Sequence, residues 1–421
     1  MQNKIINTKI KLRKFMSQLI KITYIFIIII FCMQRTYANH CDNYFELKTQ
    51  GNRIVDQCGD TFKLKSVNWY GAHDYAEVVG GLDKQPISTI ISLIKRGGFN
   101  SVRLTFSNQM LHRTTFVDTK FISANPVLAN KTPLQIFDYV VNELTKEGII
   151  VILNNHTTTS TWCCGYDVNG IWNHPYTQTT SQWINDWVML AEHFRNNPLV
   201  AGMDLRNEVR TTRYYNSYIP VFPNWGLNDH NDWKLASTEV GNMIHAVNPK
   251  VLIIVEGLNW VGVPMINGHR PMLKPIRENP IHLKISNKLV YEIHNYAYTG
   301  PTHTGDGKVS RWDIRYEDMD EVTLNKTWDE EFGFILKNDK EYTAPVWLGE
   351  FGIGITATEK GKVWFHRIIS YLIKHEMGWA YWALNATRAN GSIESFGLLN
   401  DDWSDYRQDW RTNEMKRLTN N

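Results

Sequence analysis

Eight short apolar runs recur along the chain with longer amphipathic segments between them, and this alternation restricts the fold more than any other feature. Runs rich in Val, Ile and Leu are typical of buried parallel strands, and the segments between them are typical of helices. Successive runs start roughly 35 to 55 residues apart, and eight such units close a (β/α)8 TIM barrel. The predicted strands are Leu64–Asn68, Asn100–Leu104, Ile149–Asn154, Val200–Leu205, Val251–Glu256, Leu289–His294, Val346–Leu348 and Gly378–Trp382.

The segments between the runs predict helices, several of which begin at Ser or Asp and end before Gly. A helix is also expected after the fifth strand, although Pro264, Pro271, Pro275 and Pro280 interrupt that segment. Before the first strand, Tyr44 to Lys65 alternates apolar and polar residues, which predicts a small β-hairpin under the barrel. We therefore expect one α/β domain over residues 39–421. The clearest helices are Ile87–Arg96, Pro133–Glu147, Ser181–Phe194, Asp232–Val247 and Lys360–His375.

The first 38 residues differ from the rest of the chain. Basic residues precede the apolar run Ile22 to Met33, and Thr36-Tyr37-Ala38 follows it, an order that predicts a signal peptide cleaved after Ala38. A membrane anchor is the alternative, but about 20 apolar residues are needed to span a bilayer. Cleavage removes seven of the 45 Lys and Arg and none of the 42 Asp and Glu, which leaves a formal charge of −4. We therefore expect secretion, no stable membrane association and no nucleic-acid partner.

Four of the five cysteines would remain after cleavage, an even number that suits an oxidising compartment. Cys41 could pair with Cys58, which leaves the neighbours Cys163 and Cys164 for each other. Alternatively, the two segments are cross-linked. A zinc site is disfavoured, because zinc ligands usually have Cys-x2-4-Cys spacing.

Functional side chains of a TIM barrel lie at the carboxyl ends of its strands and in the loops that follow. Most of the predicted strands here end in residues that carry chemistry, although a structural barrel could carry Ser, Thr or Gly there. These residues are Arg103, His156, Asn207, Glu208, His294, Tyr296, Glu350 and Trp382.

Two of these residues, Glu208 and Glu350, follow the fourth and seventh strands and would face each other across the barrel mouth. Such a pair suits a retaining glycosidase, whose two carboxyl groups lie about 5 to 5.5 Å apart. Glu350 would be the nucleophile and Glu208 the general acid/base, with a pKa raised by the neighbouring negative charge. Asp167, Asp204 and Glu256 are interpreted as solvated or structural acids.

The motifs that carry these residues resemble glycoside hydrolase family 5, a family of retaining (β/α)8 glycosidases. They run in the family's order from Asn52 to Trp403. One departure is Val209, where many members have proline. The matching motifs are Ser-Val-Arg103-Leu, Leu-Arg-Asn-Glu208, His294-Asn-Tyr296, Trp-Leu-Gly-Glu350-Phe-Gly and Tyr-Trp382-Ala.

The resemblance implies a role for each supporting residue. It implies that Arg103 and Tyr296 orient Glu350, that Asn207 binds the sugar 2-hydroxyl, and that His294 supports Glu208. It also implies that His156 lines the subsite of the reacting sugar and that Trp382 forms the floor of that subsite. An indole face suits the apolar face of a pyranose. Trp162, Trp172, Trp260 and Trp403 are further candidates for sugar platforms.

Within the family, phrases such as Trp162-Cys-Cys-Gly resemble a branch of plant and microbial cellulase-like proteins. That implies an endo-β-1,4-glucanase acting on a β-linked polysaccharide, without a cofactor or metal ion. The same chemistry on mannan, mixed-linkage glucan or glycosylceramide is an alternative. A catalytically silent carbohydrate-binding protein is another, but a pure binder has no need for two neighbouring carboxylates. We expect a monomer.

Overall fold

The computed structural model describes residues 44–421 except 175–176, 215–216, 218, 264–265 and 303–313, and before residue 44 only Met16 and Gln18. Two compact units divide the chain, and the larger one comprises Glu46–Asp56 and Asp60–Asn421. The expected leader, residues 1–38, therefore lies almost wholly outside the described residues. None of the helices described has the length and apolar character that a membrane span requires.

Eight parallel strands form a closed barrel in the order β10-β11-β12-β3-β4-β5-β6-β9, which confirms the predicted fold. Every predicted strand overlaps one of these eight, and both faces of most strands are buried. The bounds are β3 (Lys65–Trp69), β4 (Ser101–Ser107), β5 (Ile150–Thr157), β6 (Val200–Asp204), β9 (Leu252–Glu256), β10 (Leu289–His294), β11 (Val346–Phe351) and β12 (Gly378–Tyr381).

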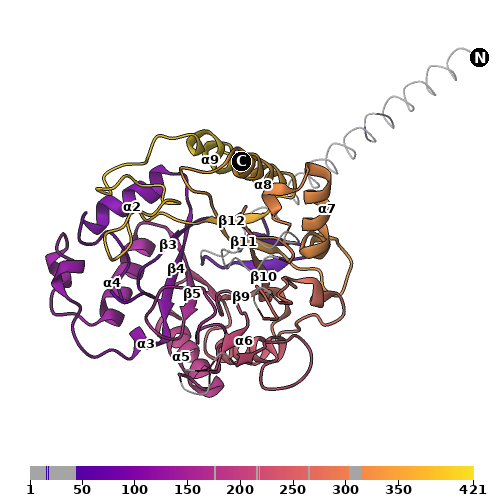
Figure 1. Cartoon of the computed structure of the whole chain (residues 1–421), viewed down its shortest axis with the longest axis horizontal. Helices are drawn as coiled ribbons and strands as arrows, with labels where there is room; N and C mark the ends of the chain where they lie inside the picture. The colour runs from indigo at the N-terminus through magenta and orange to yellow at the C-terminus, as the bar shows by residue number, and fades with distance from the viewer. Residues whose placement is uncertain are drawn as a thin grey trace, which may run out of the picture. The chain divides into compact units, whose positions relative to one another are not determined.

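Helices surround the strands (Figure 1), and their apolar faces pack on the barrel. The five clearest predicted helices are present. Helix α5 begins at Thr180, one residue earlier than predicted, because the Thr179 hydroxyl caps it by accepting a hydrogen bond from the Gln182 amide. The helices are α2 (Ile87–Arg96), α3 (Asn108–Leu111), α4 (Pro133–Lys146), α5 (Thr180–His193), α6 (Trp233–Val247), α7 (Glu321–Glu331), α8 (Glu359–Lys374) and α9 (Arg411–Thr419).

The helix expected after the fifth strand is not formed: the described residues of the proline-rich segment after β9 contain a 3-10 helix, η3, and no α-helix, because the prolines interrupt helical hydrogen bonding. Helix α7 was not predicted, because only Leu324, Trp328 and Glu331 of its mostly polar sequence are buried. The 3-10 helices are η1 (Thr119–Phe121), η2 (Pro126–Leu128), η3 (Lys274–Arg277), η4 (Ser286–Lys288), η5 (Tyr316–Asp318) and η6 (Gly333–Leu336), and a small separate ribbon joins β7 (Thr212–Arg213) to β8 (Pro220–Val221).

The predicted hairpin is formed by β1 (Lys48–Gln50) and β2 (Arg53–Val55). Gly51 in its turn has a φ of +59°, which favours glycine. The buried Lys288 Nζ, just before β10, donates to the carbonyl oxygens of Leu47 (2.6 Å) and Lys250 (2.7 Å). The hairpin is thus attached to the amino-terminal end of the barrel, which leaves the opposite end free for a site.

Glu331 on α7 is a fully buried acid that accepts one hydrogen bond, from the Tyr316 hydroxyl (2.8 Å). Burial raises the pKa of Glu331 to about 7. Because the folded pKa exceeds the unfolded one, its stabilising contribution is full at low pH and is lost as the pH rises from about 4.5 to 7. We expect Glu331→Gln to leave the free energy of unfolding nearly unchanged at pH 4.5 and to raise it by about 2–3 kcal/mol at pH 8. Urea unfolding at both pH values measures this, and an equal effect at the two would contradict it.

Candidate active site

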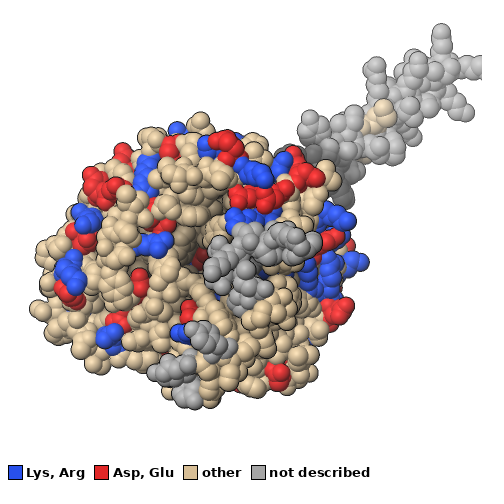
Figure 2. All heavy atoms as spheres, viewed as in Figure 1, with Lys and Arg blue, Asp and Glu red and all other residues tan. Residues whose placement is uncertain are grey.

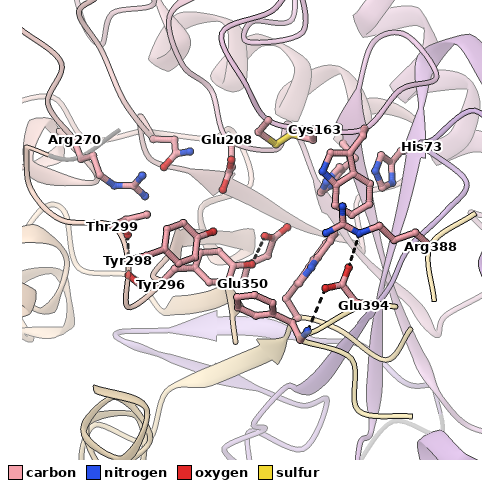
Figure 3. Close-up of a pocket in the computed structure, with 16 residues that line it drawn as sticks. His73, Cys163, Glu208, Arg270, Tyr296, Tyr298, Thr299, Glu350, Arg388 and Glu394 are labelled. Atoms are coloured by element: carbon pink, nitrogen blue, oxygen red, sulfur yellow. Dashed lines mark hydrogen bonds and ion pairs between the residues drawn. A yellow bond between two sulfur atoms is a disulfide. The ribbon is translucent and has the colours of Figure 1, made fainter. Parts of the chain in front are cut away.

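The eight predicted site residues come together at the carboxyl end of the barrel. A pocket of about 260 Å³ opens there, and it is lined by His156, Glu208, Tyr296, Glu350 and Trp382 among others (Figure 3). Arg103, Asn207 and His294 lie directly behind this lining and are fully buried. The strand-end pattern of the sequence therefore located the cluster correctly.

Glu350, on β11, is held by two donors. Arg103 Nη1 donates to its Oε1 (2.6 Å), and the Tyr296 hydroxyl donates to its Oε2 (2.8 Å). Burial raises the pKa of Glu350, while the charges of His294 and Arg103 and the Tyr296 hydrogen bond oppose that effect. Both oxygens accept charge-assisted or phenolic hydrogen bonds, an arrangement that fits an ionised carboxylate.

Glu208 lies four residues beyond the end of β6 and adopts a left-handed backbone conformation, with φ +45°. That conformation is costly for a residue other than glycine. Here it allows the Glu208 amide to donate to Glu256 Oε2 (2.5 Å). The side chain remains 14% exposed, and its Oε1 is 3.1 Å from His294 Nδ1. The exposed carboxyl is thus aimed into the pocket.

The pKa of Glu208 differs from the expectation. Burial acts to raise it, but the hydrogen bond and positive charge of His294 lower the pKa below its ordinary value, with help from Arg210 and Arg270. The sequence reasoning counted the negative charge of Glu350 and omitted the cations. The carboxyl group of Glu208 and the imidazole of His294 are therefore linked by a hydrogen bond and by opposite effects on their pKa values.

His294, the last residue of β10, is completely buried among four carboxylates. Its Nε2 is 3.2 Å from Glu292 Oε1, and its Nδ1 is 3.1 to 3.6 Å from Glu208, Glu256 and Glu350. These charges raise its pKa well above the ordinary value although burial opposes them. The carboxylates need this cation, since buried like charges repel one another.

Of the two roles expected for the acids behind the site, solvated or structural, the structure shows the structural one for Asp204 and Glu256. Asp204 and Glu256 are buried rather than solvated, and burial raises the pKa of both well above the ordinary value. Asp204 accepts from Arg103 Nε (2.7 Å), and Glu292 lies 3.4 Å from the same nitrogen. Gly349 makes room for Glu292, because an added Cβ would lie 1.6 Å from Glu292 Oε1. Sequence reasoning missed Glu292, which sits inside an apolar strand.

The distance between the two catalytic candidates is short. One carboxyl oxygen of Glu208, one of Glu350 and one nitrogen of His294 all lie within 4.8 Å of one another. Carboxyl groups about 5–5.5 Å apart are typical of retaining glycosidases, and about 6.5–9.5 Å is typical of inverting ones. The arrangement can therefore place a nucleophile and a proton donor on the same glycosidic bond.

Aromatic rings form one wall of the pocket. The Trp382 ring stacks on Tyr70, with centroids 4.9 Å apart and an interplanar angle of 5°, and it lies 5.6 Å from the His156 ring. Trp162 meets Tyr70 edge-on at 5.4 Å. Trp162 thus lies at the site, whereas Trp172 and Trp403 are buried in the core and Trp260 does not line this pocket. The wall offers flat apolar surfaces that suit sugar rings.

Several lining residues were not singled out from the sequence. His73 lies in the segment just after β3, four residues beyond the strand, so the strand-end rule would have found it. The remaining ones lie in long loops after β9, β10 and β12, where no periodic pattern marks them. These are Asn259, Arg270, Tyr298, Thr299, Arg388, Glu394 and Phe396.

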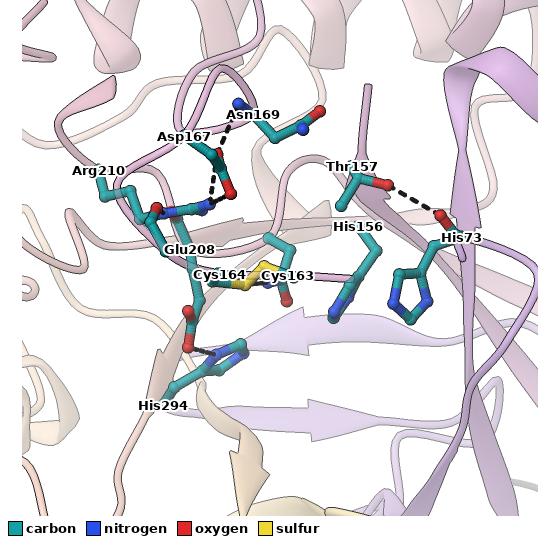
Figure 4. Close-up of a disulfide and its surroundings, with 12 residues drawn as sticks. His73, His156, Thr157, Cys163, Cys164, Asp167, Asn169, Glu208, Arg210 and His294 are labelled. Atoms are coloured by element: carbon teal, nitrogen blue, oxygen red, sulfur yellow. Dashed lines mark hydrogen bonds and ion pairs between the residues drawn. A yellow bond between two sulfur atoms is a disulfide. The ribbon is translucent and has the colours of Figure 1, made fainter. Parts of the chain in front are cut away.

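A disulfide between Cys163 and Cys164 lies near Glu208 (Figure 4), and both sulfur atoms contact the Asn207 amide. Of the pairings left open by the sequence, this one leaves no cross-link from Cys163 or Cys164 to the N-terminal cysteines. Cys58 is also disulfide-bonded, and Cys41 lies outside the described residues. The Cys163–Cys164 bond forms part of the pocket lining.

Arg103 supports both the site and the fold. Its guanidinium bonds Asp204, Glu350 and Asn207, and it has no exposed surface. Arg103→Met would leave buried carboxylates unpaired, so we expect the free energy of unfolding to fall by about 3–5 kcal/mol at pH 7. The loss should be smaller at pH 5, where the orphaned carboxylates take up protons. Denaturant unfolding at both pH values measures this effect.

Arg96→Met is the matched control for Arg103→Met, because Arg96 forms an exposed ion pair with Asp405. Exposed pairs contribute about 0–1 kcal/mol. A loss at Arg103 no larger than the loss at Arg96 would contradict the supporting role described above.

Known proteins resemble this chain in sequence and in fold. The model of the family described as cellulase (glycosyl hydrolase family 5) matches residues 55–388. An endoglucanase of Paenibacillus polymyxa is 31% identical over 370 residues, which cover 86% of this chain and 84% of the relative. The major extracellular endoglucanase of Xanthomonas campestris pv. campestris is 30% identical over 368 residues, which cover 86% of this chain and 68% of the relative.

A solved structure shows the same fold. It is a complex of a Pyrococcus horikoshii endocellulase variant with cellotetraose, with a TM-score of 0.69 and 26% sequence identity. The likeness covers 89% of this chain and 98% of the solved one.

Proposed function

Because the chain belongs to glycosyl hydrolase family 5, we propose that it is a secreted, retaining endo-β-glucanase with Glu350 as nucleophile and Glu208 as general acid/base. The most specific form of the proposal is an endo-β-1,4-glucanase. The observation that carries it is the close approach of the two carboxyl groups, within 4.8 Å at their nearest oxygens, inside an aromatic-walled pocket.

In the first step, a Glu350 oxygen attacks the anomeric carbon while Glu208 protonates the departing oxygen. The bond from the anomeric carbon to the leaving sugar breaks, and an ester to Glu350 forms. Arg103 and Tyr296 keep the attacking carboxylate ionised and oriented. In the second step, Glu208 deprotonates a water molecule, and that water releases the sugar from Glu350 with its configuration retained.

The proton that Glu208 donates is shared with His294. In the open pocket His294 holds it, which lowers the pKa of Glu208. A bound sugar excludes water, and loss of water penalises the separated charges of a protonated His294 and an ionised Glu208. Transfer of the proton from Nδ1 to Oε1 over 3.1 Å removes both charges. The second step returns the proton to Glu208, so the cycle is balanced.

The proposed substrate is a β-linked glucan. The Trp382 ring, which stacks on Tyr70, provides a floor for the reacting sugar, with His156 beside it. The relatives named as endoglucanases, and the solved complex with cellotetraose, support glucan as the polymer. Acidic and basic side chains are interspersed over the face in Figure 2, so no large patch of one sign is visible there. That distribution fits a neutral polymer better than nucleic acid.

We propose that the protein is secreted and that it is a monomer. The leader pattern of residues 1–38 supports export, and one relative is named as an extracellular enzyme. Amino-terminal sequencing of protein recovered from the medium should begin near Asn39. A chain that stays on the cell surface with its leader intact would instead indicate an anchored protein.

The activity is tested by reducing-sugar release from carboxymethyl-cellulose, lichenan, mannan and a glycosylceramide, with Glu350→Gln as the blank. We expect release from the two β-glucans, and we expect the variant to abolish it. Release from mannan or the lipid alone would keep the mechanism and replace the substrate. Release from none of the four would favour a carbohydrate-binding protein.

A further inference from the structure

Two arginines line the pocket at opposite ends (Figure 3). Arg388, in the loop after β12, is balanced: its Nε donates to Glu394 Oε2 (3.2 Å), and its guanidinium lies 4.2 Å from the centre of the Trp162 ring. Among the described residues, Arg270, in the loop after β9, forms no ion pair within 4.0 Å. The charges of Glu208 and Glu331 interact with it over longer distances. The two ends of the pocket therefore differ in charge balance.

Arg270 is a buried cation. The residue is only 3% exposed, and its Nε is buried without a hydrogen-bond partner. Its backbone amide donates to Pro301 O (2.8 Å), and the Tyr316 hydroxyl contacts the side chain. A buried charge is costly unless an opposite charge and hydrogen bonds compensate it. An anion bound at this end of the pocket would therefore compensate the charge of Arg270.

A second buried side chain in the lining of the same pocket is also unsatisfied. Asn259 comes from the same loop, lines the same pocket, is 4% exposed, and has no partner for its Oδ1. An amide oxygen accepts from a hydroxyl, and a planar guanidinium fits a carboxylate with two parallel hydrogen bonds. A sugar that carries both a carboxylate and hydroxyls would satisfy the two residues together.

The position of Arg270 identifies the sugar it would contact. In the closed barrel, β9 lies across from β3, and the loop after β3 carries Tyr70, which stacks on Trp382. That wall would hold the sugar that bonds to Glu350. Arg270 therefore lies on the other side of the cleaved bond, where the leaving sugar sits beside Glu208.

We propose that Arg270 and Asn259 bind a uronic acid as the leaving sugar, so that the enzyme prefers glucans carrying such acidic units on that side of the cleaved bond. This inference rests on the proposed glycosidase function. Glu208 gives up its negative charge when it carries the proton for the leaving oxygen, so it does not repel the uronate at that stage. Arginine is the residue suited to this recognition, because its charge persists at every working pH.

The test compares two trisaccharides, cellotriose and its analogue with glucuronic acid as the reducing-end unit, both cleaved to release that unit. We expect wild-type kcat/KM to be about 10- to 100-fold higher for the acidic analogue, and we expect Arg270→Gln to abolish that preference. Any effect of Arg270 on Glu208 changes kcat/KM for both substrates by the same factor, so it cancels in the ratio of the two values. Arg388→Gln, which removes a balanced arginine of the same pocket, should lower both values and preserve the ratio.

A wild-type ratio near one, or an equal loss on both substrates in Arg270→Gln, would overturn the proposal. If neither trisaccharide is cleaved, the proposed function fails, and calorimetry with Glu350→Gln still tests the site. That variant should bind the acidic trisaccharide more tightly than cellotriose, and equal dissociation constants would count against a uronate site.

Independently, the Cys163–Cys164 disulfide contacts the side chain of Asn207. Asn207 Oδ1 accepts from Arg103 Nη2 (2.9 Å), and its Nδ2 lies 3.3 Å from Cys164 Sγ and 3.5 Å from Cys163 Sγ. Arg103 fixes which end of the amide is oxygen, because a guanidinium only donates. The Asn207 NH2 group is thereby directed toward the disulfide and the pocket.

We infer that the disulfide is a positioning group for Asn207, which holds its NH2 group ready to donate to the 2-hydroxyl of the reacting sugar. Sulfur is a weak acceptor, so it orients this donor without competing strongly with a hydroxyl. Contacts to the 2-hydroxyl strengthen in the transition state of glycoside cleavage. The effect of the disulfide should therefore appear in kcat more than in KM.

The test uses an aryl β-cellobioside and its analogue that lacks the 2-hydroxyl on the cleaved unit. We expect the double variant Cys163→Ser, Cys164→Ser to lose about tenfold in kcat on the first and less than twofold on the second. In an Asn207→Ala background the double substitution should have no further effect on either. An equal loss on both substrates would show a merely structural disulfide and overturn the inference. If the double variant does not fold, mild reduction of the wild-type chain should give the same contrast.

Discussion

Replacing Glu350 with Ala is expected to lower kcat on β-glucan by about 10^5-fold, because the nucleophile is lost while the fold and the remaining donors stay. Glu350 accepts from Arg103 and Tyr296. In the variant these two donors face an empty volume that fits a small anion. Reducing-sugar release measures the loss, with circular dichroism to verify folding.

Azide distinguishes loss of the nucleophile from general damage to the site. An anion in the space left by Glu350 attacks the anomeric carbon directly, so Glu350→Ala should regain activity on an activated aryl cellobioside and give the inverted, α-configured glycosyl azide. A retained β-azide from this variant, or activity close to wild type without azide, would show that Glu350 is not the nucleophile.

Glu208→Ala is expected to have the second largest effect, a loss of about 10^2- to 10^4-fold on polysaccharide, where the leaving oxygen needs a proton. For a 2,4-dinitrophenyl cellobioside, the first step should be almost as fast in the variant as in the wild type, because that leaving group departs without protonation. Burst kinetics on this substrate should therefore show a fast first step and slow release of the sugar from Glu350.

Added azide should speed that slow release and give a β-configured product, because Glu350 still forms the ester. Glu147→Gln is a carboxyl control outside the site, since Glu147 forms an exposed ion pair with Lys95. An equal loss on both leaving groups in Glu208→Ala would remove the acid/base assignment.

The barrel and the gathering of the candidate site residues at one of its ends could be predicted, because both depend on local patterns. A buried parallel strand reads as a continuous apolar run, so all eight barrel strands were located. The fold then fixes where strand ends meet. Arg103, His294 and Glu350 are far apart in sequence, but each lies on a strand that leads to the same end of the barrel.

The charge balance of the site could not be predicted, because it depends on distances between strands. Sequence spacing does not show that His294 lies among four carboxylates, nor that its hydrogen bond lowers the pKa of Glu208. The burial of Asp204 and Glu256 depends in the same way on Arg103 and His294 as neighbours. Loop residues such as Arg270 and Arg388 follow no period, so their place in the pocket required the fold.

Whether Glu350 is the nucleophile is tested most directly by covalent trapping with 2,4-dinitrophenyl 2-deoxy-2-fluoro-β-cellobioside, followed by digestion and mass spectrometry. Fluorine slows both steps and the good leaving group restores the first, so the glycosyl ester accumulates. We expect one added fluorocellobiosyl group, located on the peptide that contains Glu350. A label on Glu208, or no label together with an inverted product from the unmodified substrate, would contradict it.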